Sequence, residues 1–379
     1  MKSVSIRQPS KVLIVSYGGI GDILLTTPLI SSLKAAYPNA IIHAYVQKNR
    51  ESILEGNPDI SAVYTNRFRH GIRSYMDFAL KFFRNYDLAI STRTSDRQVL
   101  FARWAGRKAI SLITPGGKGL FWKKCLLSGW AASDGNQHVV FDIIQLAEAL
   151  KIDPCSRCQA PYDPNSSRRL TKHLPFRWRS EKYAVLHPFP RNRYKQWTRS
   201  GWKIVAEFLV MRGVHVVLTG GTDKEETSYV ASLAEEMPDG VIDLSGALSL
   251  ADLAELLRHS AMYIGPDTAT THLAAIVETP TIALYGARGN RQRYMPYHSA
   301  IESTRTEQIA DGVQRNGHVY IVHGECDCDA GSTLPACERE PQKLGACMKR
   351  LRPSIVVTQI DDILLRTSLP CCGVESRAR

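Results

Sequence analysis

The segment that most constrains the fold runs from Ile264 to Tyr285 and reads IGPDTATTHLAAIVETPTIALY. Its pattern predicts a strand end, a sharp turn, a short helix and a second apolar strand. Gly265 and Pro266 stop the first strand, and the Asp-Thr pair that follows is a favoured helix N-cap. Backbone N–H groups at a helix N-terminus attract phosphate. Such a helix start between two buried strands indicates a nucleotide site in a doubly wound sheet.

A second segment, near the N-terminus, has the same strand–turn–helix pattern. Val12–Ser16 is a short apolar strand, a glycine-rich turn follows, and the helix expected over Ile23–Tyr37 carries apolar residues at helical spacing. The glycine spacing differs from the dinucleotide fingerprint Gly-x-Gly-x-x-Gly, so no NAD site is predicted. Asp22 lies at the carboxyl end of the first strand, where ligands of open parallel sheets bind. The alternative is that Asp22 only caps the helix.

Short apolar strands alternate with helices twice along the chain, which predicts two doubly wound parallel sheets. The alternation of strands and helices stops over residues 152–180, which hold four prolines and many arginines, and it restarts at Tyr183. The chain is therefore expected to be α/β with two domains whose strand ends line one cleft. The expected boundaries are 1–165 for the first domain, 166–180 for a linker, 181–352 for the second domain, with a cysteine-rich insertion at 326–347, and 353–379 for a C-terminal helix and tail.

The charge is concentrated in the first half of the chain. Residues 1–180 hold 26 Lys and Arg against 12 Asp and Glu, whereas the whole chain has a net charge of +12. A basic half indicates an acidic partner such as a phosphorylated glycolipid, an anionic membrane or nucleic acid, and general solubility is the plain alternative. No apolar run approaches a membrane span, and residues 1–10 lack the core of a signal peptide. We expect a cytoplasmic protein, peripheral on the cytosolic membrane face.

Four of the nine cysteines are close together, in the pattern Cys326-x-Cys328-x8-Cys337-x9-Cys347. Four thiols in a polar stretch without regular structure suit a tetrahedral structural metal. Zinc is the default, and iron bound by four thiolates is also compatible. The alternative is a set of reduced cytosolic cysteines in a loop.

Four motifs in order carry a resemblance to the family of ADP-heptose:lipopolysaccharide heptosyltransferases. They are Gly18-Gly19-Ile20-Gly21-Asp22 with Thr26-Thr27-Pro28, His187-Pro188 with Lys195-Gln196-Trp197, Leu218-Thr219-Gly220-Gly221, and Asp267-Thr268 with His272-Leu273-Ala274 and Thr279-Pro280. The resemblance implies the GT-B arrangement of two facing Rossmann-like domains. The donor, ADP-heptose, would bind mainly to the second domain, and the acceptor, the inner core of lipopolysaccharide, mainly to the first.

The resemblance also implies the chemistry. Asp22 would be the general base of a single inverting displacement, and Lys195 would face the donor diphosphate. The helix start after Asp267 would hold the same phosphates, so no cofactor is required for catalysis. We expect donor contacts from Gly21, Thr219, Gly220, Glu225, Leu248, Asp267, Thr268, Ala269 and His272. Acceptor contacts are expected from Gly18, Gly19, Arg67 and Arg93.

The chain departs from the family pattern at two places. Ala269 stands where the family has Gly, and the stretch 288–296 carries three arginines that we expect either to contact the donor phosphates or to recognise a different sugar. Competing functions are a protein (adhesin) heptosyltransferase, a nucleotide-sugar epimerase of similar architecture and a nucleotide-binding module without catalysis. Nucleic acid is not expected as a partner, because aromatic residues are not interleaved with the basic clusters.

Overall fold

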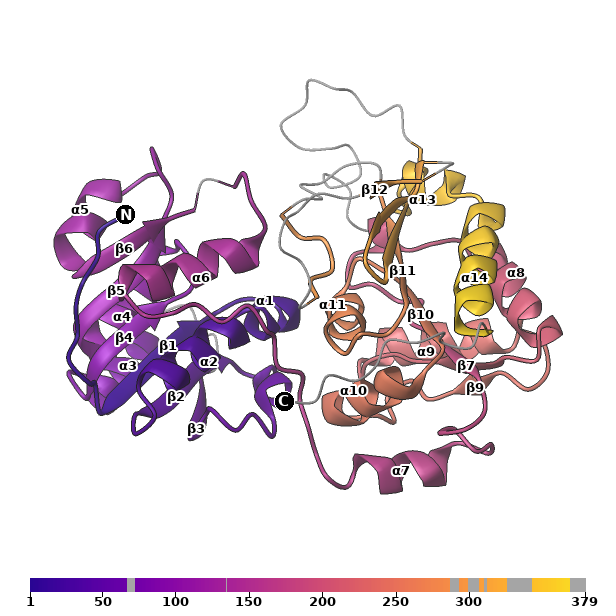
Figure 1. The fold of residues 1–379 in the computed structure, drawn as a ribbon, viewed down its shortest axis with the longest axis horizontal. Coiled ribbons are helices and arrows are strands. Elements are labelled where there is room, and N and C mark those ends of the chain that lie inside the picture. Colours follow the sequence, from indigo (N-terminus) through magenta and orange to yellow (C-terminus); the bar gives the residue numbers. More distant parts are fainter. Residues whose placement is uncertain are drawn as a thin grey trace, which may run out of the picture. The chain divides into compact units, whose positions relative to one another are not determined.

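The computed structural model describes residues 1–66, 72–133, 135–286, 293–298, 307–309, 312–325 and 343–368 (Figure 1). The chain divides into two compact units. The first contains Met1–Ser167, Ser249–Glu255 and Asn290–Thr304, and the second contains Arg168–Leu248, Leu256–Gly289 and Arg305–Arg379. The first break, after Ser167, lies near the expected end of the first domain at 165, and two short segments of the second half of the chain belong to the first unit.

The first unit is built on a parallel sheet of six strands within the described residues, in the order β3-β2-β1-β4-β5-β6. The order reverses beside β1, so the loops after β1 and β4 leave the sheet at its topological switch point. The strands are β1 (Lys11–Ser16), β2 (Ile41–Gln47), β3 (Ala62–Asn66), β4 (Tyr86–Ser91), β5 (Gly106–Ile113) and β6 (Gly129–Ala132).

Helices cover both faces of this sheet. One apolar core joins the sheet to α2 and α6 through residues such as Leu33 and Leu146, and a second joins it to α3 and α4 through Phe78 and Phe101. The helical elements are α1 (Ile20–Leu24), α2 (Thr27–Ala36), the 3-10 helix η1 (Glu51–Leu54), α3 (Ile72–Phe82), α4 (Asp96–Ala105), α5 (Leu120–Leu126) and α6 (Val139–Ala149).

The second unit contains a mixed sheet in the order β12-β13-β14-β11-β10-β7-β8-β9. Its strands from β14 to β9 are parallel, and β12 and β13 add an antiparallel edge. The strands are β7 (Tyr183–Leu186), β8 (His215–Leu218), β9 (Ile242–Asp243), β10 (Met262–Pro266), β11 (Thr281–Tyr285), β12 (Glu307–Gln308), β13 (Gln314–Asn316) and β14 (Val319–His323).

The helices of the second half of the chain complete the core of the second unit. Trp197 and Trp202 are fully buried there, and the indole N–H of Trp197 donates to the carbonyl of Leu351 at 3.0 Å. The helices are α7 (Ser166–His173), η2 (Arg193–Lys195), α8 (Arg199–Met211), α9 (Lys224–Ala234), α10 (Leu250–His259), α11 (Ala269–Ile276), α13 (Ala346–Arg350) and α14 (Pro353–Ser368). Among the described residues, no helix is both long and apolar enough to span a bilayer.

Two expectations about local structure are corrected. The helix expected over Ile23–Tyr37 is interrupted, because Pro28 has no N–H and the hydroxyls of Thr26 and Thr27 donate to carbonyls of the preceding turn. The expected linker 166–180 contains α7. Leu170, inside this helix, and Leu174 and Trp178, which follow it, are buried.

Candidate active site

Asp22 lies in α1, immediately after the glycine turn that follows β1. Its Oδ2 accepts the backbone N–H of Gly19 at 2.6 Å and lies 2.6 Å from Nη1 of Arg93. The N–H contact is the capping-box bond of a helix N-terminus, so the capping interpretation of Asp22 holds in part. The carboxylate also remains partly exposed and lines a cavity. Capping and a chemical role are therefore compatible in this residue.

Gly18 is required by this geometry. A Cβ atom on Gly18 would lie 2.6 Å from Oδ2 of Asp22 and 2.8 Å from Nη1 of Arg93. Its carbonyl accepts a hydrogen bond from the guanidinium of Arg50. The absence of a side chain at Gly18 thus lets Asp22, Arg93 and Arg50 pack against this turn. This packing accounts for a glycine at the position even if Gly18 makes no contact with the acceptor.

A cavity of about 290 Å³ lies beside Asp22, entirely within the first unit. Its wall is formed where four neighbouring strands end: Ser16 is the last residue of β1, Thr92 follows β4, Thr114 follows β5 and Ser133 follows β6. The remaining lining residues are Asp22, Arg93, Thr94, Leu112, Gly135, Val139, Ile143, Arg293 and Tyr294. Hydroxyls and two guanidiniums converge here, as a polar and anionic ligand requires.

Arg293 lines this cavity from a segment that is distant in sequence. Its guanidinium lies 2.8 Å from Oδ2 of the fully buried Asp142 and donates to the hydroxyl of Ser133 at 2.9 Å. The segment is held by His138, whose Nε2 hydrogen bonds to the carbonyl of Met295 at 2.9 Å. Arg293 therefore lines the same cavity as Asp22, and its expected role in contacting the donor phosphates or in recognising a different sugar stays a prediction. Arg288 and Arg291 lie outside the described residues.

In the second unit, Lys195 and Asp267 form an ion pair. Nζ of Lys195, at the end of η2, lies 2.6 Å from Oδ2 of Asp267, which follows β10, and both side chains are partly exposed. The pair brings together two motifs that are 72 residues apart in sequence. It places a cation directly before the N-terminus of α11, where the helix dipole would also favour a bound anion.

The N-terminus of α11 offers backbone donors. Thr268 is the N-cap and its side chain makes no capping hydrogen bond; its hydroxyl lies 3.3 Å from that of Thr271 instead. Ala269 is the first helical residue, so the methyl group that replaces the family glycine fits helical backbone. His272 is buried one turn later.

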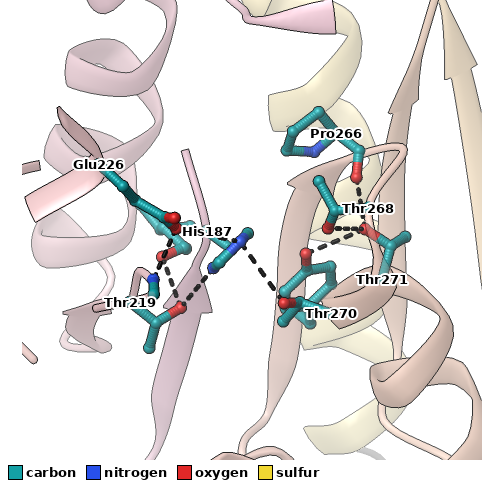
Figure 2. A network of polar contacts seen from close by, with 10 residues as sticks. His187, Thr219, Glu226, Pro266, Thr268, Thr270 and Thr271 are labelled. Atoms are coloured by element: carbon teal, nitrogen blue, oxygen red, sulfur yellow. Dashed lines mark hydrogen bonds and ion pairs between the residues drawn. The ribbon is translucent and has the colours of Figure 1, made fainter. Parts of the chain in front are cut away.

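His187, directly after β7, is the centre of a buried polar network (Figure 2). Its Nδ1 lies 3.2 Å from the hydroxyl of Thr219, and its Nε2 lies 3.4 Å from that of Thr270. Burial lowers the pKa of His187 to about 4, so the imidazole is neutral at physiological pH. The network ties the ends of β7 and β8 to the first turn of α11 and so holds the backbone at the start of α11 in place.

Glu226, rather than Glu225, turns toward this network. Oε1 of Glu226 accepts the N–H of Gly221 at 2.6 Å and lies 3.9 Å from Nε2 of His187. Burial raises the pKa of the Glu226 carboxyl. Glu225 is exposed at the start of α9, where its N–H is capped by Asp223. Sequence reasoning missed Glu226 because adjacent glutamates in a helix start cannot be distinguished without knowing the helix phase.

The other expected site residues are scattered. Gly220 and Leu248 are half-buried in the second unit, and Gly21 lies inside α1. Arg67 lies outside the described residues, as do Cys326, Cys328 and Cys337. Cys347 is described and buried. No group of three His, Cys, Asp or Glu suited to a metal occurs within the described ranges, so the four-cysteine site stays a prediction.

Comparisons with known proteins decide the family. The model of glycosyltransferase family 9 (heptosyltransferase) matches residues 83–316. Lipopolysaccharide heptosyltransferase 3 of Escherichia coli is 32% identical over 277 residues, which cover 70% of this chain and 81% of that protein. The chain belongs to glycosyltransferase family 9. This family 9 member is therefore a nucleotide-sugar-dependent glycosyltransferase, as the sequence motifs predicted.

Solved structures agree on the fold of this family 9 enzyme. The E. coli ADP-heptose lipopolysaccharide heptosyltransferase II has a TM-score of 0.71 at 16% identity, covering 95% of this chain and all of the other. The E. coli heptosyltransferase WaaC with ADP has a TM-score of 0.67 at 17% identity, covering 93% and 99%. The predicted class, α/β with two Rossmann-like units of the GT-B type, is confirmed.

Proposed function

We propose that this enzyme transfers a heptose from ADP-heptose to the inner core of lipopolysaccharide at the cytosolic face of the membrane. The observation that carries the proposal is the 32% identity to a lipopolysaccharide heptosyltransferase over 81% of that relative's length. A solved relative of the same fold holds ADP, which supports an adenine nucleotide donor. The cavity beside Asp22, with Arg93 and Arg293 in its wall, suits an acceptor sugar that carries carboxylate or phosphate groups.

Asp22 is the general base in this proposal. Gly19 and Arg93 both contact Oδ2, and no hydrogen bond to Oδ1 occurs among the described residues. Oδ1 is therefore the oxygen placed to accept the proton of the acceptor hydroxyl. As that proton moves to Asp22, the hydroxyl oxygen forms a bond to the anomeric carbon and the bond from that carbon to the diphosphate breaks. One displacement without an enzyme nucleophile inverts the anomeric centre.

Lys195 and the start of α11 stabilise the departing ADP. The lysine supplies a point charge and the helix supplies N–H donors, so charge that develops on the diphosphate is met without a metal ion. Asp267 holds Lys195 in position before the donor binds. A structural metal in the cysteine-rich segment would be held by Cys326, Cys328, Cys337 and Cys347 and would take no part in transfer.

The test is turnover of ADP-heptose with a heptose-deficient lipopolysaccharide core, followed as ADP release. We expect turnover with the core and none with an unglycosylated adhesin. Turnover with the adhesin alone would replace the lipid acceptor by the protein alternative. Binding of ADP without any transfer would support the non-catalytic alternative.

A further inference from the structure

Helix α3 is apolar on two sides. Its inner side buries Phe78 and Phe82 in the core against the sheet. Its outer side exposes Met76 and Leu80 (84% exposed). Phe83 (64% exposed) directly follows the helix, and its N–H still bonds to the carbonyl of Ala79, so the three residues form one stripe at spacings of four and three. An isolated exposed leucine needs no explanation, but a continuous outer stripe on a helix that is already packed indicates a second binding partner.

Helix α5 extends this surface. Phe121 is 83% exposed and Leu126 is also exposed, while Trp122 and Leu127 pack inward. Helix α4 lies between the two, because α3 packs on α4 and α4 packs on α5. Five of the twelve large exposed apolar side chains in the described residues belong to this one helical layer, so the exposure is concentrated rather than scattered.

The same layer is basic. The helices α3, α4 and α5 together contain 6 Lys and Arg against 2 Asp and Glu. Lys81, Arg84, Lys118 and Lys124 are exposed next to the apolar side chains. Lys81 lies over the ring of Tyr64 at 4.5 Å, and Lys124 over that of Trp130 at 5.6 Å, so aromatic faces hold both ammonium groups near this surface.

We propose that this apolar–basic face, formed by α3, α4 and α5, docks the enzyme on an anionic lipid bilayer. Leucine, methionine and phenylalanine enter the boundary between head groups and acyl chains, and lysines and arginines contact the lipid phosphates. A second copy of this chain would bring one basic layer against another, which opposes self-association. Nucleic acid would contact the basic groups but leave the aliphatic stripe exposed to water.

Docking through this face suits a lipid-linked acceptor but does not depend on which sugar is transferred. Both α3 and α5 begin at the carboxyl edge of the sheet, and α5 starts six residues after Thr114, which lines the cavity beside Asp22. A bilayer against the first turn of α5, where Phe121 is exposed, would therefore lie beside the edge of the sheet where an acceptor sugar would bind.

Vesicle co-sedimentation of the full-length protein tests the docking. Phosphatidylcholine vesicles are compared with vesicles that also contain phosphatidylglycerol, for wild type, Leu80→Ser/Phe83→Ser/Phe121→Ser and Lys118→Glu/Lys124→Glu. Met211→Ser/Leu365→Ser is the matched control, because both side chains are exposed in the second unit. We expect about tenfold stronger partitioning of wild type into the anionic vesicles, a loss of about tenfold in both test variants, and an unchanged control.

Equal partitioning of wild type and both test variants would overturn the proposal. So would a dimer of wild type in lipid-free solution that the triple serine variant converts to a monomer, since the face would then be a subunit interface. Transfer to a delipidated core oligosaccharide should be unchanged in the triple variant, a result that separates failure of docking from failure of the proposed chemistry. If the triple variant does not fold, the charge variant alone decides.

Discussion

Lys195 and Asp267 meet at 2.6 Å, although one ends a 3-10 turn after β7 and the other follows β10. The pair lies just before the N-terminus of α11, where a diphosphate would accept hydrogen bonds from backbone N–H groups. Donor binding would exchange part of this internal ion pair for contacts between the ammonium and the phosphates. In the proposed mechanism, this ion pair would keep the Lys195 ammonium ordered before the donor binds.

Removal of the Lys195 ammonium should weaken nucleotide binding. For Lys195→Ala we expect the Kd of ADP to rise about tenfold or more, because a charge-assisted contact to the diphosphate is lost. Isothermal calorimetry measures the change. Lys203→Ala is the control, because Lys203 is exposed on α8. The Kd of this variant for ADP should match that of wild type. An unchanged Kd for Lys195→Ala would place the donor elsewhere.

Replacement of the proposed base should separate chemistry from binding. Asp22→Asn keeps the shape and the contact with Gly19 but cannot take a proton, so kcat should fall about a thousandfold while ADP affinity stays unchanged. Steady-state ADP release and calorimetry give the two values. Asp153→Asn, at an exposed position of the first unit, should behave as wild type. A kcat near the wild-type value would remove Asp22 from the mechanism.

Arg293 should affect both stability and the acceptor. Arg293→Met leaves the fully buried Asp142 without its cation, and we expect a loss of about 3 kcal/mol in the free energy of unfolding. We also expect Arg293→Met to raise the KM for the acceptor. Adding Asp142→Asn should recover much of the lost stability, but it should leave the acceptor KM raised. Urea unfolding and acceptor kinetics measure the two effects. An acceptor KM that returns to the wild-type value in the double variant would show that Arg293 has only a structural role.

The buried His187 predicts lower stability in acid. Its folded pKa of about 4 lies below the value of 6.5 for an unperturbed histidine. As the pH falls from about 6.5 to 4, the unfolded chain binds a proton at this histidine that the folded protein does not bind. The free energy of unfolding therefore falls by about 3 kcal/mol because of this residue. Glu226, with a raised pKa, acts in the opposite direction at the acidic end of this range.

His187→Gln isolates the histidine contribution from that of Glu226. Urea unfolding at neutral and acidic pH should show a shallower loss of stability for this variant than for wild type. His173→Gln, at an exposed position, should follow the wild-type curve. Parallel curves for wild type and His187→Gln would exclude the imidazole as the source of acid sensitivity.

The sequence predicted the features that depend on local pattern. Apolar runs placed β1, β10 and β11 and the restart at β7, and the Asp-Thr step placed the start of α11. Four-residue β6 was missed because Gly, Ala and Ala have low strand propensity. β14 was also missed, although its run of Val, Tyr, Ile and Val is a typical strand signal.

Contacts between distant segments could not be predicted in this way. The Asp22–Arg93 and Lys195–Asp267 pairs join residues whose membership of the site was predicted but whose partners were not. Arg293 was noted, but its place beside Asp142 depends on a segment of the second half packing in the first unit. Nothing in the local sequence of 293–298 encodes which unit it joins, because its anchors, such as His138, lie more than a hundred residues away.

The central claim is transfer of a heptose from ADP-heptose to a lipopolysaccharide core. Mass spectrometry of a heptose-deficient core after incubation with the wild-type enzyme and ADP-heptose tests it most directly, with Asp22→Asn in parallel. The account predicts a core heavier by one heptose residue with wild type and an unchanged core with the variant. An unchanged core with both proteins, or a gain of sugar only from a uridine or guanosine diphosphate donor, would contradict it.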